Sequence, residues 1–189
     1  MMKSALQLGV NPNAKREEND YYATHPSAIE IALPMLRKCG LNQNVWECAC
    51  GEGHISEVLI KNGYNVYSSD LIDRGYGDVL DFLQTDKKFN GDILTNPPFK
   101  IAEDFIEKAM ELIPTGNNVF MFLKIQFLES ESRAKLFEKY PIKYVLPYSR
   151  RQKCSKNAEF EKYTATTQFY AWFVFEKGWH GDTILKHIK

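Results

Sequence analysis

The chain lacks an excess of charge of either sign. Its 189 residues include 24 lysines and arginines and 24 aspartates and glutamates, so the formal net charge is zero. A neutral protein has no overall field that gathers a polyanion, so contact with nucleic acid would require a local basic patch. The length and the 44% hydrophobic composition are those of an ordinary globular domain with a sizeable core.

Cysteine pairs and long hydrophobic runs are also missing. The four cysteines form no CxxC pair and are too sparse for a disulfide scaffold, so we expect no metal site and a reducing compartment. No apolar run approaches the roughly 20 residues of a membrane span, and Met1–Val10 lacks the pattern of a secretory signal. These absences predict a cytoplasmic protein without a membrane segment.

The most informative stretch, Asp92–Phe99, is an apolar run that ends in an amide, two prolines and an aromatic ring. Because Pro97 and Pro98 cannot donate ladder hydrogen bonds, a strand must end just before them. The residue before a proline is held extended, so the Asn96 amide should project from the strand end beside the Pro97 carbonyl and the Phe99 ring. Such a set suits a planar ligand that carries an amino group.

A second pattern precedes this one in the chain. A buried strand over Val45–Cys48 is followed by Gly51 and Gly53, a helix over Ile55–Asn62, and a strand over Asn65–Ser69 that ends at Asp70. Strand, glycine turn, helix, strand and acid make up half of a nucleotide-binding fold, in which the acid accepts hydrogen bonds from a ribose. The third glycine of that fingerprint is absent, so the turn alone equally fits an ordinary turn with a helix cap.

The rest of the chain alternates between helices and strands. We expect helices over Pro26–Gly40, Ile101–Ile113 and Ser130–Tyr140, and strands over Asn118–Phe127, Lys143–Tyr148 and Thr167–Phe175. This alternation predicts an α/β fold with a mostly parallel sheet, helices on both faces and an antiparallel last strand. Residues 1–20 read as a flexible arm, residues 21–189 as one domain, and Trp179–Lys189 as a surface tail or a last short helix. The structure of Asp78–Leu83 is left open.

The Asn96–Phe99 tetrad matches in full the catalytic motif of class I methyltransferases that use S-adenosylmethionine, and the chain resembles the small phage-type enzymes that methylate adenine in DNA. The resemblance implies a Rossmann-like domain with a seven-stranded sheet and no separate target-recognition domain. It also implies that Asn96, Pro97, Pro98 and Phe99 are catalytic. Asn96 and the Pro97 carbonyl would accept hydrogen bonds from the exocyclic amine, and Phe99 would stack on the base.

The same resemblance implies a site for S-adenosylmethionine. Its residues would be Tyr22, Thr24, Glu47, Gly51, Gly53, Asp70, Asp81, Phe82 and Asn96. The glycine turn would hold the methionine part, although Glu47 stands where such enzymes more usually have aspartate. Asp81 and Phe82 would meet the adenine, and the segment Tyr22–Pro26 would cover the methionine end, although His25 departs from a common double proline.

A basic stretch late in the sequence is the clearest local patch. It holds Arg150, Arg151, Lys153 and Lys156, interleaved with Tyr148, Phe160 and Tyr163. The preceding strand should run parallel to the others and so deliver this loop to the edge where Asn96 lies. We expect residues 149–164 to bind DNA, with a solvated hairpin loop as an equal alternative.

The acceptor stays open at this level. Asn-Pro-Pro-aromatic motifs also serve planar amides and other base amines, so a protein glutamine or a ribosomal RNA base is the alternative to adenine in DNA. A non-catalytic nucleotide- or DNA-binding module of the same fold is a further alternative.

Overall fold

The computed structural model describes residues 22–152, 154–156 and 168–189. Helices α1 (Pro26–Lys38), α2 (His54–Lys61), α3 (Ala102–Leu112) and α4 (Ala134–Lys139) surround a sheet. The 3-10 turns are η1 (Phe99–Ile101), η2 (Ile125–Leu128) and η3 (Glu131–Arg133). The strands are β1 (Tyr22–Thr24), β2 (Asn44–Glu47), β3 (Asn65–Asp70), β4 (Asp78–Val79), β5 (Asp92–Thr95), β6 (Asn118–Lys124), β7 (Ile142–Pro147), β8 (Cys154–Lys156), β9 (Tyr170–Glu176) and β10 (Ile184–Leu185).

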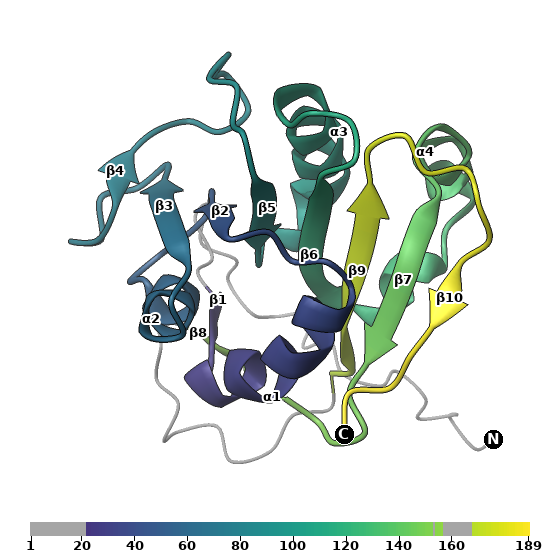
Figure 1. Cartoon of the computed structure of the whole chain (residues 1–189), viewed down its shortest axis with the longest axis horizontal. Coiled ribbons are helices and arrows are strands. Elements are labelled where there is room, and N and C mark those ends of the chain that lie inside the picture. The colour runs from purple at the N-terminus through teal and green to yellow at the C-terminus, as the bar shows by residue number, and fades with distance from the viewer. Residues whose placement is uncertain (1–21, 153, 157–167) are drawn as a thin grey trace, which may run out of the picture.

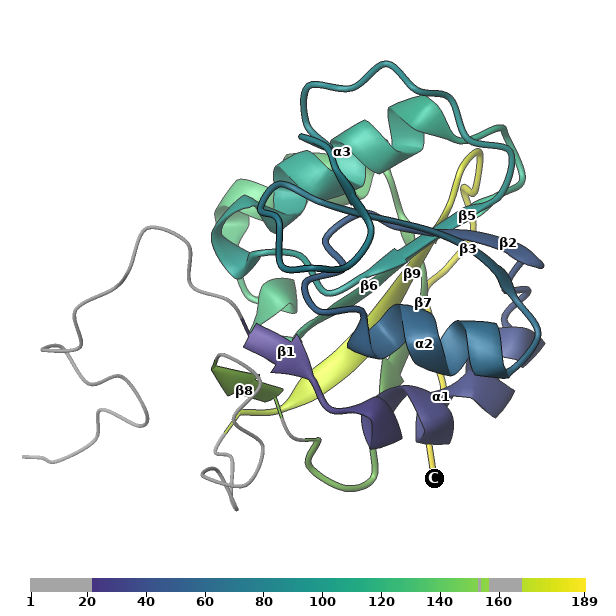
Figure 2. The same cartoon turned by 90° about the vertical axis from the view of Figure 1, so that its left-hand side faces the viewer.

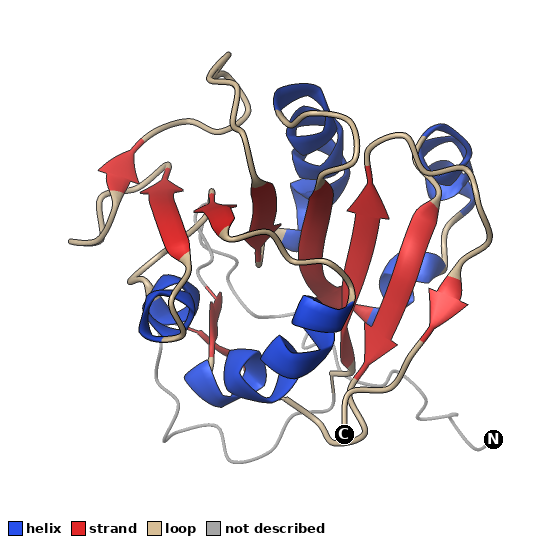
Figure 3. Cartoon of the chain, viewed as in Figure 1, coloured by secondary structure: helices blue, strands red, loops and turns tan. Residues whose placement is uncertain are grey.

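One sheet organises the described part of the chain (Figures 1 and 3). Its eight strands follow the order β10-β7-β9-β6-β5-β2-β3-β4. Only β9 runs against its neighbours, pairing antiparallel with both β6 and β7. The predicted mostly parallel sheet with an antiparallel strand after β7 is therefore confirmed, and β7 does run in the same direction as β5 and β6.

Helices cover both faces of the sheet, with α1 and α2 on one face and α3 and α4 on the other (Figure 2). Side chains alternate along β6, so this strand contributes to the hydrophobic core on both faces of the sheet. Val119, Met121 and Leu123 pack toward α3, whereas Phe120 and Phe122 pack toward α1. A strand buried on both faces reads as a continuous apolar run, which is why this strand is evident in the sequence.

The structure corrects the bounds of two predicted elements. The strand predicted over Asn118–Phe127 ends at Lys124, because the chain turns into η2 at Ile125 after one last backbone hydrogen bond from the Ile125 N–H to the Phe169 carbonyl at 2.8 Å. The helix predicted over Ser130–Tyr140 starts as a 3-10 turn and becomes α-helical only over Ala134–Lys139. Ser130 and Ser132 bond through their hydroxyls at 2.7 Å, and such local side-chain bonds compete with helix formation.

The segment predicted as a tail or short helix instead contributes a strand. Ile184 and Leu185 form β10, which pairs parallel with Tyr144 and Val145 of β7. A two-residue edge strand with exposed side chains has no hydrophobic periodicity, so the sequence pattern could not reveal it. Together with β4, in the stretch left open, β10 brings the sheet to eight strands where seven were expected.

A separate two-stranded ladder lies beside the sheet. Strand β1 pairs antiparallel with β8, matching Tyr22 with Lys156 and Thr24 with Cys154. The segment before the first helix, predicted to cover the methionine end of the cofactor, is thus extended and paired, and it brings residues from two distant parts of the chain together. No helix in the described ranges is long and apolar enough to cross a membrane.

Candidate active site

Four adjacent parallel strands deliver polar residues to one edge of the sheet. Strands β3, β2, β5 and β6 are neighbours in that order, and their carboxyl ends are Asp70, Glu47, Thr95 and Lys124. Asn96, Pro97 and Pro98 follow directly after β5. The carboxyl edge of an open α/β sheet is where such folds bind ligands, so both sequence motifs lie where ligand binding is expected.

The side chain of Asn96 is fixed by strand β1. Its Nδ2 donates to the Tyr22 carbonyl at 2.9 Å and to the Thr24 hydroxyl at 3.0 Å. A carbonyl oxygen only accepts hydrogen bonds, so the amide nitrogen must face Tyr22. Three residues predicted at one site are therefore in direct contact.

The other end of the same amide is unsatisfied. Asn96 Oδ1 is buried and has no hydrogen-bond partner among the described residues. A buried acceptor without a donor costs about 1–3 kcal/mol, so native proteins rarely leave one without a function. The arrangement presents an oriented acceptor to which a ligand N–H can donate.

Thr24, which holds the Asn96 amide, is itself packed against strand β8. Thr24 is 3% exposed, and the Cys154 thiol lies within hydrogen-bonding reach of the Thr24 and Tyr170 hydroxyls. Burial raises the pKa of Cys154 to about 12, so the thiol is neutral at pH 7 and behaves as a packing group. Asn96 is thus held by a chain of contacts that runs through β1 to β8 and β9.

Phe99 lies half-buried at the start of η1, next to the tetrad's prolines. Its ring centroid is 6.1 Å from that of Tyr170, and Lys124 Nζ stands 4.9 Å from the Phe99 centroid. Tyr170 in turn stacks on Phe122 at 5.0 Å. The ring is therefore positioned by the ends of β6 and β9, beside a lysine ammonium group.

The glycine turn and the acid at the end of β3 contact each other directly. The Gly51 N–H donates to Asp70 Oδ2 at 2.8 Å, and Oδ1 of the same carboxylate accepts the Ile72 N–H at 2.9 Å. Gly51 and Gly53 have positive φ values of 56° and 84°. Asp70 therefore stabilises the glycine turn, and its predicted contact with a ribose stays a prediction.

Gly53 is in close contact with an aromatic ring. A side-chain carbon at Gly53 would come within 2.5 Å of the Tyr76 ring, so only glycine permits this contact. The loop that carries Tyr76 is tied back by the Cys50 thiol, which donates to the Tyr76 carbonyl at 3.5 Å. Burial raises the pKa of Tyr76. The Tyr76 ring thus packs directly against the glycine turn at Gly53.

Glu47 is engaged inside the protein. Its carboxyl group is 1% exposed and accepts a hydrogen bond from the Ser56 hydroxyl, which also contacts the Ser68 hydroxyl at 2.6 Å. Burial raises the pKa of Glu47 to about 8, so the carboxyl group is largely neutral at pH 7. Its contacts join β2 to α2 beneath the glycine turn.

The two residues predicted to meet adenine lie in different surroundings. Asp81 is exposed, and its Oδ1 accepts the Leu83 N–H at 2.9 Å. Phe82 is 2% exposed and lies in the core, 5.2 Å from Trp46 and 5.1 Å from Phe105 between ring centroids. In this structure Phe82 packs as a core residue on the α3 side.

The basic loop is described only in part. Arg150 and Arg151 are exposed after β7, Lys153 lies outside the described residues, and Lys156 is described only as the last position of β8. Tyr148, expected among the stacking surfaces, is buried instead, because its hydroxyl bonds to Ala28 and Trp172. Phe160 and Tyr163 also lie outside the described ranges.

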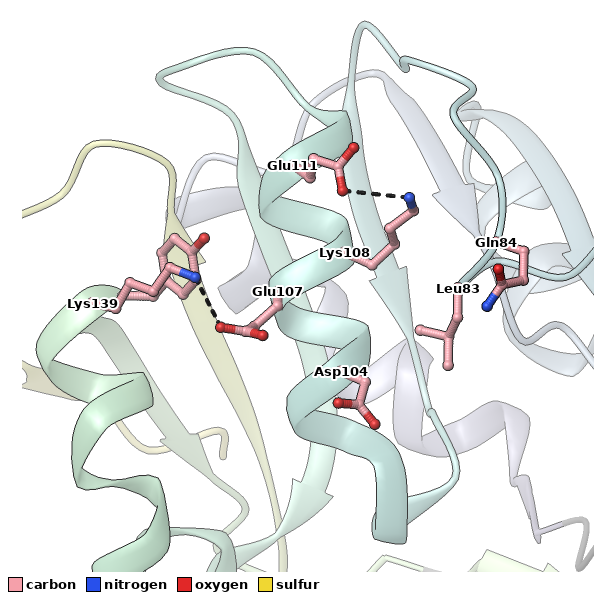
Figure 4. Close-up of a pocket in the computed structure, with 8 residues that line it drawn as sticks. Leu83, Gln84, Asp104, Glu107, Lys108, Glu111 and Lys139 are labelled. Atoms are coloured by element: carbon pink, nitrogen blue, oxygen red, sulfur yellow. Dashed lines mark hydrogen bonds and ion pairs between the residues drawn. The ribbon is translucent and has the colours of Figure 1, made fainter.

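Two surface clefts flank helix α3. The smaller, about 140 Å³, adjoins Phe99 and is lined by Phe99, Leu123, Lys124, Gln126, Phe127 and Arg133. The larger, about 540 Å³, lies along α3 between Leu83 and the end of α4 (Figure 4). Ion pairs of Lys108 with Glu111 at 3.4 Å and Lys139 with Glu107 at 2.9 Å cross its walls. None of the predicted site residues lines the larger cleft.

Sequence reasoning missed the groups that surround Phe99 and Gly53. Lys124 and Tyr170 are brought to Phe99 by the antiparallel pairing of β6 with β9, and Tyr76 reaches Gly53 from a loop. The only available signal was the position of Lys124, a single charge at the end of the most apolar strand. Such a residue marks a strand end at the ligand-binding edge.

Comparison with known proteins gives a fold and no closer relative. No family model matches the sequence, and no curated protein matches it. Among solved structures, a Listeria monocytogenes protein assigned to the class I S-adenosylmethionine-dependent methyltransferases has a TM-score of 0.60 and 13% identity, and the match covers 86% of this chain and 64% of that one.

Two further structures agree. An O-methyltransferase of Thermotoga maritima that depends on S-adenosylmethionine has a TM-score of 0.56 and 13% identity, covering 86% of this chain and 69% of that one. The magnesium protoporphyrin IX methyltransferase of Synechocystis, solved with S-adenosylmethionine bound, has a TM-score of 0.55 and 14% identity over 81% of this chain and 79% of that one. This chain therefore has the Rossmann-like class I methyltransferase fold.

The residues present fit the cofactor that this fold implies. Gly51 and Gly53 form a turn that permits close approach, which the Tyr76 ring already makes at Gly53, and Asp70 stands half-exposed at the end of β3 with its carboxylate directed at the turn. The buried, unpaired Oδ1 of Asn96 supplies an acceptor at the end of β5, two strands away in the same sheet. The glycine turn, Asp70 and Asn96 thus lie along one edge of the sheet.

Proposed function

We propose that this chain transfers a methyl group from S-adenosylmethionine to the exocyclic N6 amine of adenine in DNA. The observation that carries the proposal is the Asn96 amide, whose nitrogen is held by β1 and whose buried oxygen has no partner among the described residues. An amide oriented in this way accepts an N–H from a planar amine and does not suit a carbonyl group, which has no proton to donate.

Each half of the site has a defined task. Gly51, Gly53 and Asp70 would hold S-adenosylmethionine, which supplies a methyl group on a positively charged sulfur. Asn96 Oδ1 and the Pro97 carbonyl accept the two N–H bonds of the amine, which leaves the nitrogen lone pair free for attack. Because these acceptors are held rigidly before binding, they also stabilise the positive charge that develops on the amine nitrogen. The proton released from that nitrogen passes to solvent.

Two features favour a nucleobase as the acceptor. The Phe99 ring follows the tetrad and offers a stacking surface, and base–aromatic stacking contributes about 1–3 kcal/mol per base. In addition, the β1·β8 ladder places the segment after the exposed Arg150 and Arg151 next to the strand that holds Asn96. Arg150 and Arg151 can then bind backbone phosphates next to the acceptor base.

The acceptor class is tested by incubating the protein with radiolabelled S-adenosylmethionine and, separately, duplex DNA, RNA and cell protein. Nucleoside mass spectrometry should find N6-methyladenine in the DNA. Label confined to protein or to RNA would refute the DNA assignment, and the absence of S-adenosylmethionine binding in a calorimetric titration would refute the enzyme itself.

The role of Asn96 is tested by Asn96→Ala. We expect transfer to fall by at least about a hundredfold, as on removal of a transition-state donor or acceptor in other enzymes, while calorimetric affinity for the cofactor stays within about twofold. The matched control is Asn65→Ala. It removes an exposed amide at the amino end of β3, away from the carboxyl edge of the sheet where Asn96 lies, and should leave transfer unchanged. Full activity in Asn96→Ala would remove this residue from the mechanism.

A further inference from the structure

The segment that follows β3 holds the glycine turn at both of its glycines. At the end of β3, the Asp70 carboxylate accepts the Gly51 N–H at 2.8 Å. The loop of residues 71–77 then connects β3 to β4 without a helix. Near the end of this loop, the Tyr76 ring lies so close to Gly53 that a side-chain carbon there would come within 2.5 Å of the ring. The turn that is proposed to hold the cofactor is thus fixed from one neighbouring segment.

Tyr76 is itself anchored where it meets the turn. Its carbonyl accepts the Cys50 thiol at 3.5 Å, and its phenol group lies near the Ser56 side chain in the first turn of α2. The next residue, Gly77, has a positive φ of 71° and passes so close to β3 that a side-chain carbon would come within 2.7 Å of the Ser68 carbonyl oxygen. The end of the loop is therefore held against β3 and α2, and the fold sets the position of the ring.

A turn built on two glycines at positive φ needs contacts of this kind to be ordered. Glycine loses more conformational freedom on folding than any other residue, and a ligand that must order a loop on binding loses affinity accordingly. The Tyr76 ring already occupies the approach to Gly53. Tyr76 therefore affects a bound cofactor through the turn and takes no part in the transfer itself.

We infer that Tyr76 is a positioning residue of the donor site, whose ring keeps the glycine turn ordered in the conformation that binds S-adenosylmethionine. The inference deepens the proposed function and rests on it, because it takes the glycine turn as part of the donor site. Without the ring, the turn becomes ordered only on binding, so part of the binding free energy goes into ordering it.

The test combines two measurements on the full chain. Calorimetry gives the affinity for S-adenosylmethionine, and hydrogen–deuterium exchange without cofactor reports the order of residues 50–57. If the cofactor must fix the backbone of about one residue, Tyr76→Ala should weaken binding about five- to thirtyfold. Exchange in residues 50–57 should rise, whereas exchange in β6, on the other side of β5, should stay unchanged. Tyr76→Phe keeps the ring, so its affinity should stay within about twofold of the wild-type value.

The control is Tyr140→Ala, which removes a half-buried tyrosine on the α3 side of the sheet and should change neither quantity. If Tyr76→Ala does not fold, Tyr76→Leu, with a smaller apolar side chain, should show the same two effects.

The outcomes separate this inference from the proposed function. If the wild-type protein binds S-adenosylmethionine and the variant binds it equally well or more tightly, Tyr76 does not position the turn, while the proposed function stands. Faster exchange throughout β6 would also overturn the inference, because Tyr76 would then have a general structural role. If the wild-type protein does not bind S-adenosylmethionine, both are wrong.

Discussion

At the scale of single residues, the site depends on which way one amide points. Asn96 Nδ2 has two acceptors, the Tyr22 carbonyl and the Thr24 hydroxyl, and their removal would let the amide rotate and withdraw Oδ1 from the incoming amine. If Asn96 binds the acceptor as proposed, Thr24 acts through it as a positioning residue. The resemblance to known methyltransferases had suggested cofactor binding for it, a role that stays a prediction.

Thr24→Val should lower the transfer rate without weakening acceptor binding equally. Valine keeps the shape of threonine but offers no acceptor, and one hydrogen bond contributes about 0.5–1.5 kcal/mol, so we expect kcat to fall about two- to tenfold with a smaller change in KM. Thr24→Ser should restore the rate. Steady-state kinetics decide this, and a parallel loss in thermal stability and KM with no serine rescue would indicate a purely structural role.

At the scale of elements, the unit formed by β2, the glycine turn and α2 contains a buried acid. Glu47 has a pKa of about 8 in the folded protein against an ordinary value of 4.5, because burial disfavours its charged form. Between these values, unfolding releases a proton from Glu47. The free energy of unfolding therefore falls as pH rises through this window, by up to about 1.4 kcal/mol per pH unit for one group.

Glu47→Gln should remove that dependence. The glutamine carbonyl still accepts the Ser56 hydroxyl, but the side chain does not titrate, so the variant should gain stability relative to the wild-type protein as pH rises from 5 to 8. Urea unfolding at several pH values measures the difference, and groups shared by both proteins cancel. Parallel curves would show that Glu47 is ionised in the folded state.

How far an element could be predicted depended on how local its determinants are. The glycine turn and Asp70 follow from a β-α-β pattern contained within 26 residues, Val45 to Asp70, and they do contact each other. Strands β1, β8 and β10 have two or three residues each, too few for a periodic pattern, and they exist because a distant segment pairs with them.

Side-chain environments were harder to predict than elements. Tyr148 and Phe82 were both assigned ligand contacts, yet each packs in the core of this structure. An aromatic residue at a strand end or in a turn has the same local sequence whether it faces a pocket or the interior. The distinction comes from partners such as Trp172 for Tyr148 and Phe105 for Phe82, which are far away in the chain.

At the scale of the whole molecule, one buried hydroxyl joins three elements. Tyr148 follows β7, donates to the Ala28 carbonyl of α1 at 2.7 Å and accepts from Trp172 Nε1 of β9 at 2.7 Å. Helix α1 is thereby attached to the antiparallel end of the sheet. The tyrosine expected to face the ligand instead holds the scaffold together.

Tyr148→Phe should destabilise the protein by about 1–3 kcal/mol, because the Ala28 carbonyl and the Trp172 N–H stay buried without a partner. Tyr144→Phe, within β7 and half-buried beside Lys143 and Lys186, is the control and should have little effect. Urea midpoints give the comparison. Equal midpoints would mean that water or a rearranged side chain replaces the hydroxyl.

The contact between Asn96 and β1 has a consequence for biogenesis. Its partners lie 72 and 74 positions earlier in the chain, and β1 in turn pairs with β8, whose first residue, Cys154, comes 58 positions after Asn96. Contacts of such long separation form late in folding, after local helices and turns. During synthesis, the β1·β8 ladder that supports the amide is completed only after β8 has left the ribosome, so a nascent chain can fold its glycine turn long before the Asn96 amide is fully held in place.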